Sequence, residues 1–76
     1  MPIFDAIIYS WHARQRMKQR RIAAKDVELT LWIGEGHPGD DGTWIYELGD
    51  IRVVIVDADD DSTAHIVTII RMRNRT

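Results

Sequence analysis

Residues 10–22 read Ser10-Trp11-His12-Ala13-Arg14-Gln15-Arg16-Met17-Lys18-Gln19-Arg20-Arg21-Ile22. The segment predicts a helix over residues 11–21, and Ser10 is its expected N-cap because a serine hydroxyl can accept an unpaired N–H of the first turn. His12, Arg16 and Arg20 recur every four residues, so a helix places them on one face. Such a face can bind a phosphate, since arginine stays charged and histidine titrates near neutral pH.

The same helix is expected to face the core through Ala13, Met17 and Trp11. A second helix is predicted over residues 24–33, where apolar side chains recur at helical spacing. Gly34 follows at once, and glycine is the usual residue at a left-handed helix end. The first half of the chain therefore predicts two consecutive helices.

Three strands are predicted after the helices, over residues 43–48, 51–56 and 64–72. A Gly-Asp pair joins the first two as a hairpin turn. Residues 3–9 are apolar and predict either a short strand or an extra turn of helix. Residues 35–42 hold three glycines, a proline and two aspartates, so they predict a loop.

The element order (β)ααβββ predicts an α+β fold, with two N-terminal helices packed on one face of a three- to four-stranded antiparallel meander sheet. Apart from Arg52, the segment 51–56 is apolar, which is typical of a central strand. In the last strand, alternation predicts one face made of Ala64, Ile66, Thr68, Ile70 and Met72. Residues 1–76 are expected to form a single domain, with residues 71–76 as a mobile basic tail.

The composition excludes several classes of protein. The chain has no cysteine and therefore no disulfide, and no apolar run approaches the roughly 18 residues of a membrane span. Its first residues lack the cationic region of a signal peptide, so a cytoplasmic protein is expected. Three tryptophans exceed what so small a core can bury, which predicts a homodimer with Trp32 or Trp44 at the contact.

Charge is segregated along the chain. Residues 1–25 carry six Lys or Arg and one acid, residues 26–70 carry one base and eleven acids, and residues 71–76 carry three arginines. If the last strand runs beside the first helix, the two basic blocks form one patch on an acidic body. A patch of this kind is the electrostatic feature of a polyanion site.

The helical motif is part of a longer pattern. It begins with His12-Ala13-Arg14-Gln15-Arg16-Met17-Lys18-Gln19-Arg20-Arg21-Ile22. It continues with Val27, Leu31, Gly34, Tyr46, Gly49, Ile-Arg-Val-Val at 51–54 and Ile-Val-Thr-Ile at 66–69. From residue 9 to about residue 70, the pattern resembles the small bacterial and archaeal domains of unknown function family 4258.

The resemblance implies a RelE-like fold, because these domains are often grouped with the RelE/ParE-like toxins and the wider barnase–EndoU–colicin–RelE nuclease fold. It implies metal-independent RNA cleavage without a cofactor, with RNA and an antitoxin-like protein as partners. The chain departs from the pattern in its acidic middle, since RNase toxins are typically strongly basic. It also has Ala23-Ala24 before the second helix, where a Ser or Thr cap is usual.

Metal-independent RNA cleavage requires a base, an acid and a cation beside the phosphate. His12 is the candidate base or acid, and Arg16 and Arg20 complete the candidate catalytic set as phosphate ligands. Three further residues are candidate substrate-binding residues: Arg14, Arg52 and Thr68.

The arginines also have purely structural alternatives. Arg16 and Arg20 can form surface salt bridges with acids of the second helix, such as Asp26. Arg52 can pair with an acid near the hairpin, Asp50 or Glu47.

No metal site is expected. The three histidines, His12, His37 and His65, lack the short spacings of zinc sites, and His37 is expected in a loop. The aspartates in 57–61 begin like a calcium loop, but the later glycine and glutamate ligands are missing, so they predict a solvated turn.

Two hypotheses from different classes follow. The first is a RelE-like, toxin-like RNA-binding protein or metal-independent ribonuclease. The alternative is a non-catalytic homodimeric protein-interaction module whose acidic face binds a basic partner.

Overall fold

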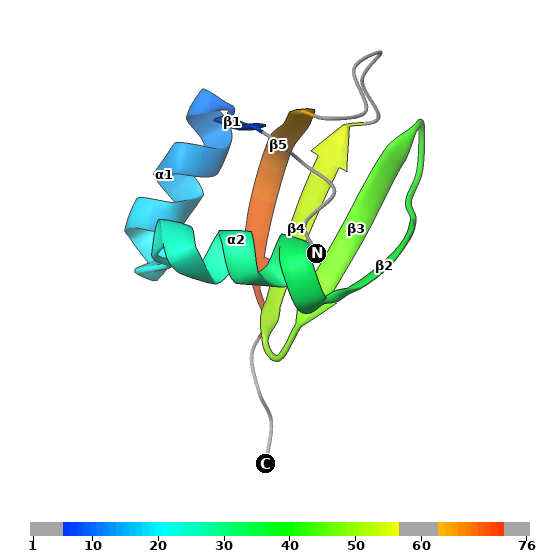
Figure 1. Cartoon of the computed structure of the whole chain (residues 1–76). Helices are drawn as coiled ribbons and strands as arrows, with labels where there is room; N and C mark the ends of the chain where they lie inside the picture. The colour runs from blue at the N-terminus through cyan, green and yellow to red at the C-terminus, as the bar shows by residue number, and fades with distance from the viewer. Residues whose placement is uncertain (1–5, 57–62, 73–76) are drawn as a thin grey trace.

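The structure, a computed structural model, describes residues 6–56 and 63–72 (Figure 1). In chain order its elements are β1 (Ala6–Tyr9), α1 (Trp11–Arg20), α2 (Ala24–Ile33), β2 (Glu35–Pro38), β3 (Thr43–Leu48), β4 (Ile51–Val56) and β5 (Thr63–Arg71). Two helices pack against a five-stranded sheet, which confirms the predicted α+β fold. The predicted aspartate-rich turn and residues 73–76 of the predicted tail lie outside the described residues.

The sheet has the order β1-β5-β4-β3-β2, with β4 in the middle as predicted. Strands β2 to β5 form an antiparallel meander, whereas β1 pairs parallel with β5, from Ala6 opposite Thr63 to Tyr9 opposite Ile66. The expected antiparallel sheet of three to four strands is therefore corrected to a mixed sheet of five. A parallel pair is possible here because the chain leaves β1 through α1 and not through a hairpin turn.

Strand β2 corrects the loop predicted over residues 35–42. It is an exposed edge strand, where glycine and proline are tolerated because one side of the backbone needs no partner. Gly36 lies opposite Tyr46, and a Cβ at Gly36 would be 2.7 Å from Cε2 of the tyrosine ring. Pairing with β3 thus outweighs the loop composition, and the glycine leaves room for the aromatic ring.

Helix α1 begins at the predicted N-cap. The Oγ of Ser10 accepts the N–H of Ala13 at 3.0 Å and donates to the carbonyl oxygen of Val67 in β5 at 2.9 Å. Arg21 ends the helix in the left-handed region, with a φ of 55°. Trp11, expected in the core, is 73% exposed. Its side chain points away because it lies two residues from buried Ala13, about 200° around the helix.

Helix α2 spans the predicted residues and buries Val27, Thr30 and Leu31. Gly34 follows it in an extended conformation, with φ −73° and ψ 166°, so the predicted left-handed end is wrong. A Cβ on Gly34 would lie 2.6 Å from the carbonyl oxygen of Glu47 and closer still to that of Thr30. Glycine is required here by the close approach of the chain to β3.

A β-bulge in β5 changes which of its residues face the core. Ile55 pairs with Ile66 and Val54 pairs with Thr68, which leaves Val67 as the extra residue. Beyond the bulge the alternation shifts by one position, so Thr68 faces away from the core. The predicted alternation is therefore wrong for the second half of the strand.

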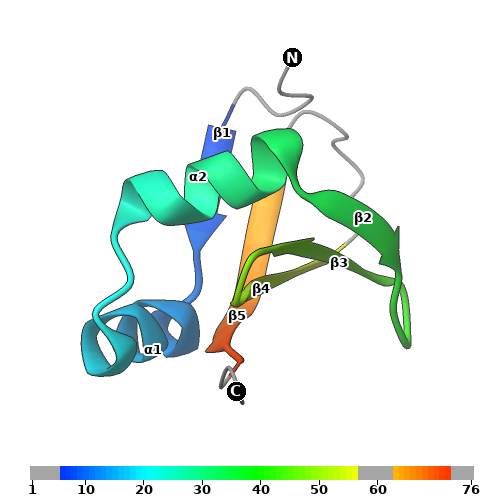
Figure 2. The same ribbon diagram turned by 90° about the horizontal axis from the view of Figure 1, so that it is seen from below.

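The core lies between the helices and one face of the sheet. It consists of Ala13, Ile22, Val27, Leu31, Ile51, Val53, Ile55, Ala64, Ile66 and Ile69. Helix α2 crosses this face over β3 and β4, while α1 lies beside β5 (Figure 2).

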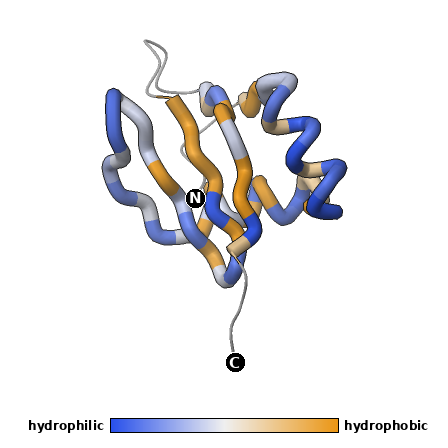
Figure 3. The backbone as a smooth tube through the Cα atoms, turned by 180° about the vertical axis from the view of Figure 1, so that it is seen from behind, coloured by the Kyte–Doolittle hydropathy of each residue, from blue (hydrophilic) through white to orange (hydrophobic). Residues whose placement is uncertain are grey.

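The opposite side of the sheet, which we call the outer face, is not covered by either of the described helices (Figure 3). Cross-strand register arranges its residues in three rows: Glu35, Glu47, Arg52 and Ile70; His37, Ile45, Val54 and Thr68; and Thr43, Val56, His65 and Ile8. Polar side chains therefore share this face with exposed aliphatic ones.

Candidate functional site

Helix α1 and the residue after it carry five cations and no acid: Arg14, Arg16, Lys18, Arg20 and Arg21. His12 and Arg20 are exposed, and Arg16 between them is half-buried. The three residues of the predicted catalytic set thus lie on successive turns of one helix, and exposed Arg14 lies on the same helix.

None of these five cations forms an ion pair with another residue in 6–56 or 63–72. The predicted salt bridges between Arg16 or Arg20 and the acids of α2 are therefore wrong for this part of the chain. Asp26 instead accepts the backbone N–H of Ala23 at 3.3 Å, at the start of α2.

Like charges on α1 repel one another. Arg14 and Lys18, and Arg16 and Arg20, are four residues apart, a spacing at which like charges cost roughly 0.2–0.5 kcal/mol per pair. Lys18 and Arg20 lie in the last turn, where the helix dipole partly offsets this cost. A polyanion bound along α1 would remove the repulsion and satisfy several cations together.

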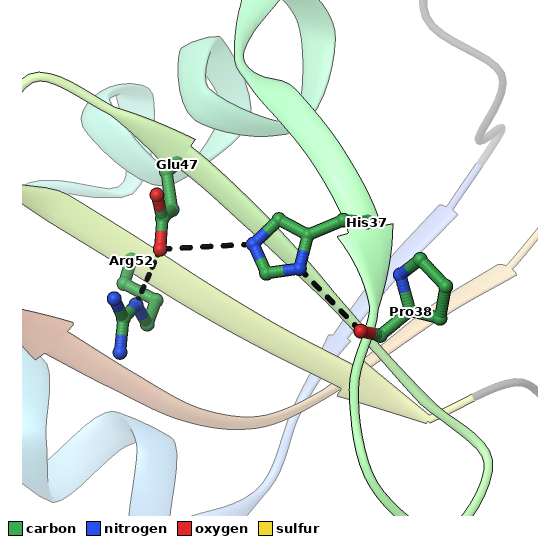
Figure 4. A network of polar contacts seen from close by, with 4 residues as sticks. All are labelled: His37, Pro38, Glu47 and Arg52. Carbon is green, nitrogen blue, oxygen red and sulfur yellow. Dashed lines mark hydrogen bonds and ion pairs between the residues drawn. The ribbon is translucent and has the colours of Figure 1, made fainter.

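A second polar constellation lies on the outer face and joins three strands. The Nε of Arg52 in β4 donates to Oε2 of Glu47 in β3 at 2.7 Å, and Nε2 of His37 in β2 lies 3.8 Å from the same oxygen (Figure 4). We call these three residues the outer-face cluster. Direct pairing of Glu47 with Arg52 and of His37 with Ile45 brings the three side chains together.

Both ring nitrogens of His37 face acceptors. Its Nδ1 is 3.4 Å from the carbonyl oxygen of Pro38, and its Nε2 faces the carboxylate of Glu47 (Figure 4). Neither acceptor can donate a proton, so a neutral ring can donate an N–H to only one of the two. The contact with Glu47, at 3.8 Å, is longer than a hydrogen bond.

The structure divides the predicted site residues between two surfaces. His12, Arg14, Arg16 and Arg20 lie on α1, whereas Arg52 and Thr68 lie on the outer face. Within the described residues, no hydrogen bond or ion pair joins the α1 residues to either of the other two. The bulge at Val67 turns Thr68 onto the same face as Arg52, in the neighbouring row.

Sequence reasoning missed His37, because residues 35–38 were assigned to a loop. Two acids, Asp50 and Glu47, were the predicted alternative partners of Arg52, and the structure pairs it with Glu47, whereas Asp50 lies 3.7 Å from Nε of Arg71. One signal was available: Glu47 and Arg52 flank the Gly49-Asp50 turn symmetrically, which places them opposite each other in a hairpin. Nothing in the sequence placed His37 beside them.

Two tyrosines have raised pKa values. Burial raises the pKa of Tyr46 above 10.0, and burial followed by the nearby charge of Glu28 raises the pKa of Tyr9. Both side chains pack against the core and neither belongs to the outer-face cluster.

Two further features are absent from the described ranges. No group of three or more His, Cys, Asp or Glu residues there could hold a metal ion. No helix there is long and apolar enough to cross a membrane.

The arrangement of helices and strands is similar to that of a solved structure. A chain in the crystal structure of the toxin-antitoxin complex RelBE2 from Mycobacterium tuberculosis superposes with a TM-score of 0.64. The alignment covers 87% of this chain and 95% of that chain, at 21% sequence identity. The RelE-like fold expected from the sequence is thereby confirmed.

The chain belongs to the family described as Domain of unknown function (DUF4258), whose model matches residues 9–71. This confirms the resemblance found in the helical motif and the strands. A comparison with curated proteins gave no match.

Proposed function

We propose that this chain is a toxin-like RNA-binding domain that holds RNA phosphates along α1. The observation that carries the proposal is the set of five cations on and after α1, none of which forms an ion pair among the described residues. A single-stranded RNA supplies phosphates at a spacing that several of these cations can contact together. Arginine is suited to this because its guanidinium can bind a phosphate through two N–H groups.

The predicted catalytic set of His12, Arg16 and Arg20 belongs to the same proposal. An imidazole beside two guanidinium groups can move a proton while the cations hold a phosphate. The binding part of the proposal does not depend on this chemistry, so binding and cleavage are measured separately.

An antitoxin-like protein is the second proposed partner, and the cytoplasm is the proposed location of both. The RelBE2 chain was crystallised as part of a toxin-antitoxin complex. In this chain, the exposed aliphatic residues of the outer face offer an apolar contact surface: Ile8, Val56 and Ile70 are 38–49% exposed. Burying such residues against a partner would be favourable, at about 25 cal/mol per Å² of apolar area.

The test is fluorescence anisotropy with a labelled single-stranded RNA over a range of salt concentrations. We expect the variant R14Q/R16Q/R20Q to bind more weakly and to lower the slope of log K against log salt by about 0.7 for each phosphate that it no longer neutralises. The matched control is R14K/R16K/R20K, which keeps the charge and should keep most of the binding. Equal affinity and slope for the Gln variant and the parent would disprove binding along α1.

A non-catalytic homodimeric interaction module is the second candidate function. One observation favours it: Leu29, Trp32 and Ile33 form an apolar face on α2, and each is 44–60% exposed. Helical spacing places the three side chains together. A second copy of the chain could cover this face.

A further inference from the structure

We propose that Trp11 is a base-stacking site, where its indole ring packs on one unpaired base of a single-stranded RNA whose phosphates lie on Arg14 and Lys18. The inference rests on the proposed function and deepens it, because it names a part of the nucleic acid that α1 contacts besides the phosphates. Trp11 was expected in the core, and its exposure in the structure is the observation that leads to this site.

Trp11 is the most exposed large hydrophobic residue among those that the structure describes. Its exposed fraction is 73%, compared with 60% for Ile33 and 53% for Trp32. It is not one of the partly buried hydrophobic residues that pack against the core. Its indole N–H forms no hydrogen bond to another described residue. The fold therefore makes little use of this ring, which is available to a ligand.

Two cations lie beside the ring. Helix geometry places Arg14 and Lys18 within about 60° of Trp11 around the axis of α1. Both are exposed, and neither forms an ion pair with another described residue. Ala13, on the other side of the helix, is buried against the sheet. The ring and the two cations thus form one stripe that faces away from the core.

The spacing along this stripe suits a nucleotide. Arg14 and Lys18 follow Trp11 by three and seven residues, which is about 4.5 and 10.5 Å along the helix axis. A base that stacks on Trp11 has its phosphate one sugar away, within reach of these long side chains. Aromatic rings beside a cationic surface are the usual means of binding single strands. Because every base has a π face, such a site selects unpaired bases and tolerates any sequence.

A lipid surface is another anionic partner that tryptophan and cations can contact. A helix that lies on a membrane buries a continuous apolar face. Helix α1, which is described throughout, has no such face: Trp11 is its one exposed large hydrophobic residue, and its other exposed residues are polar. The observations therefore favour a nucleic acid, and lipid binding becomes an outcome of the test.

The experiment measures the fluorescence anisotropy of a labelled mixed-sequence RNA, as a single strand and as a duplex, over a range of salt concentrations. For Trp11→Ala we expect the affinity for the single strand to fall by roughly 5- to 150-fold, the range for loss of one base–aromatic stack. The salt slope should equal that of the parent, because indole neutralises no phosphate. The affinity for the duplex should not change, because its bases are already paired and stacked.

The chain offers matched controls for the loss of the ring. Trp32→Ala removes an exposed tryptophan from the other helix and should bind the single strand like the parent. Trp11→Phe keeps an aromatic face and should retain part of the affinity that Trp11→Ala loses. Thermal unfolding of Trp11→Ala should match that of the parent, because the side chain is exposed.

The outcomes separate this inference from the proposed function. Equal binding of the single strand by Trp11→Ala and the parent overturns the stacking site, while weaker binding by R14Q/R16Q/R20Q leaves the proposed function standing. A parent that binds no RNA overturns both. An equal loss of affinity for single strand and duplex, or an equal loss in Trp32→Ala, also overturns stacking at Trp11. Phosphatidylglycerol vesicles that bind the parent but not Trp11→Ala, with RNA binding unchanged, overturn it in favour of a lipid surface.

Discussion

At the scale of single residues, two glycines occupy positions where any larger residue would clash with its neighbours. Gly34 has an ordinary extended backbone, yet a Cβ there would meet carbonyl oxygens of both α2 and β3. Gly36 makes room for the ring of Tyr46. These two glycines let α2 continue directly into β2, and so they place His37 beside β3.

The buried hydroxyl of Tyr9 allows the energetic cost of an unpaired polar group to be measured. Its hydroxyl is buried and has no hydrogen-bond partner among the residues that the structure describes. A buried polar group without a partner costs about 1–3 kcal/mol. We therefore expect Tyr9→Phe to raise the free energy of unfolding, by about 1 kcal/mol, in urea denaturation followed by circular dichroism. A loss of stability of similar size would show that the hydroxyl has a partner.

The same tyrosine predicts how stability depends on alkaline pH. Burial raises the pKa of Tyr9 above its usual 10.0 in the folded chain, with a further contribution from Glu28. A raised pKa means that stability is fully present below about pH 10 and is lost as the pH rises through the folded-state value. Tyr9→Phe should make this loss shallower, and Tyr46→Phe should do the same because burial also raises the pKa of Tyr46. An unchanged alkaline slope in both variants would contradict the assignment.

At the scale of elements, the two helices begin differently. Ser10 caps α1 with its side chain and also bonds to the carbonyl of Val67 in β5. The N-cap of α2 is Ala23, which has no side-chain oxygen, so only the reciprocal contact from Asp26 is present there. The start of α1 is thus tied to the sheet, while the start of α2 has an unused capping position.

This difference predicts opposite effects of two small substitutions. Ser10→Ala removes a cap and a contact with β5, and should lower the free energy of unfolding by about 1–2 kcal/mol. Ala23→Ser supplies a missing cap in a backbone of suitable conformation, with φ −80° and ψ 154°, and should raise it by about 0.5–1 kcal/mol. Thermal and urea unfolding of both variants measure the effects. A destabilised Ala23→Ser variant would refute this account of the second cap.

At the scale of the whole molecule, the two helices cover one face of the sheet and leave the other open. Aliphatic residues of the outer face, among them Ile8, Val56 and Ile70, are exposed in the part of the chain that the structure describes. The five cations on and after α1 lie on a different surface from the outer-face cluster, in which Arg52 pairs with Glu47. One small domain therefore presents a cationic helix, a sheet face of mixed polar and aliphatic residues, and an apolar helix face.

The apolar face of α2 predicts self-association. Leu29, Trp32 and Ile33 are exposed together, and burying them against a second copy would remove a large apolar area from water. We expect sedimentation at high micromolar concentration to give a dimer, and Trp32→Lys to give a monomer with an unchanged melting profile at low concentration. Trp11→Lys, on the exposed side of α1, is the control. A parent that sediments as a monomer would exclude this contact.

Local patterns accounted for the elements that form from neighbouring residues. The N-cap at Ser10, the two helices, the Gly49-Asp50 hairpin and the apolar strand 51–56 were all predicted, because each depends on residues close together in the chain. The same locality explains why Glu47, which pairs with Arg52 across the hairpin, was one of the two acids predicted for it. Family resemblance added the RelE-like arrangement of these elements.

The sequence by itself thus determined the helices, the central hairpin and the cationic side of α1. Only the tertiary structure decided that β2 is a strand, that β1 runs parallel to β5, and that the bulge at Val67 turns Thr68 outward. Each of these depends on pairing between strands. The stability of such a pairing depends on the neighbouring strand and on burial, so it cannot be predicted from the residues of one strand alone. The meeting of His37 with Glu47 and Arg52 is of this kind, because it exists only once β2 has paired with β3.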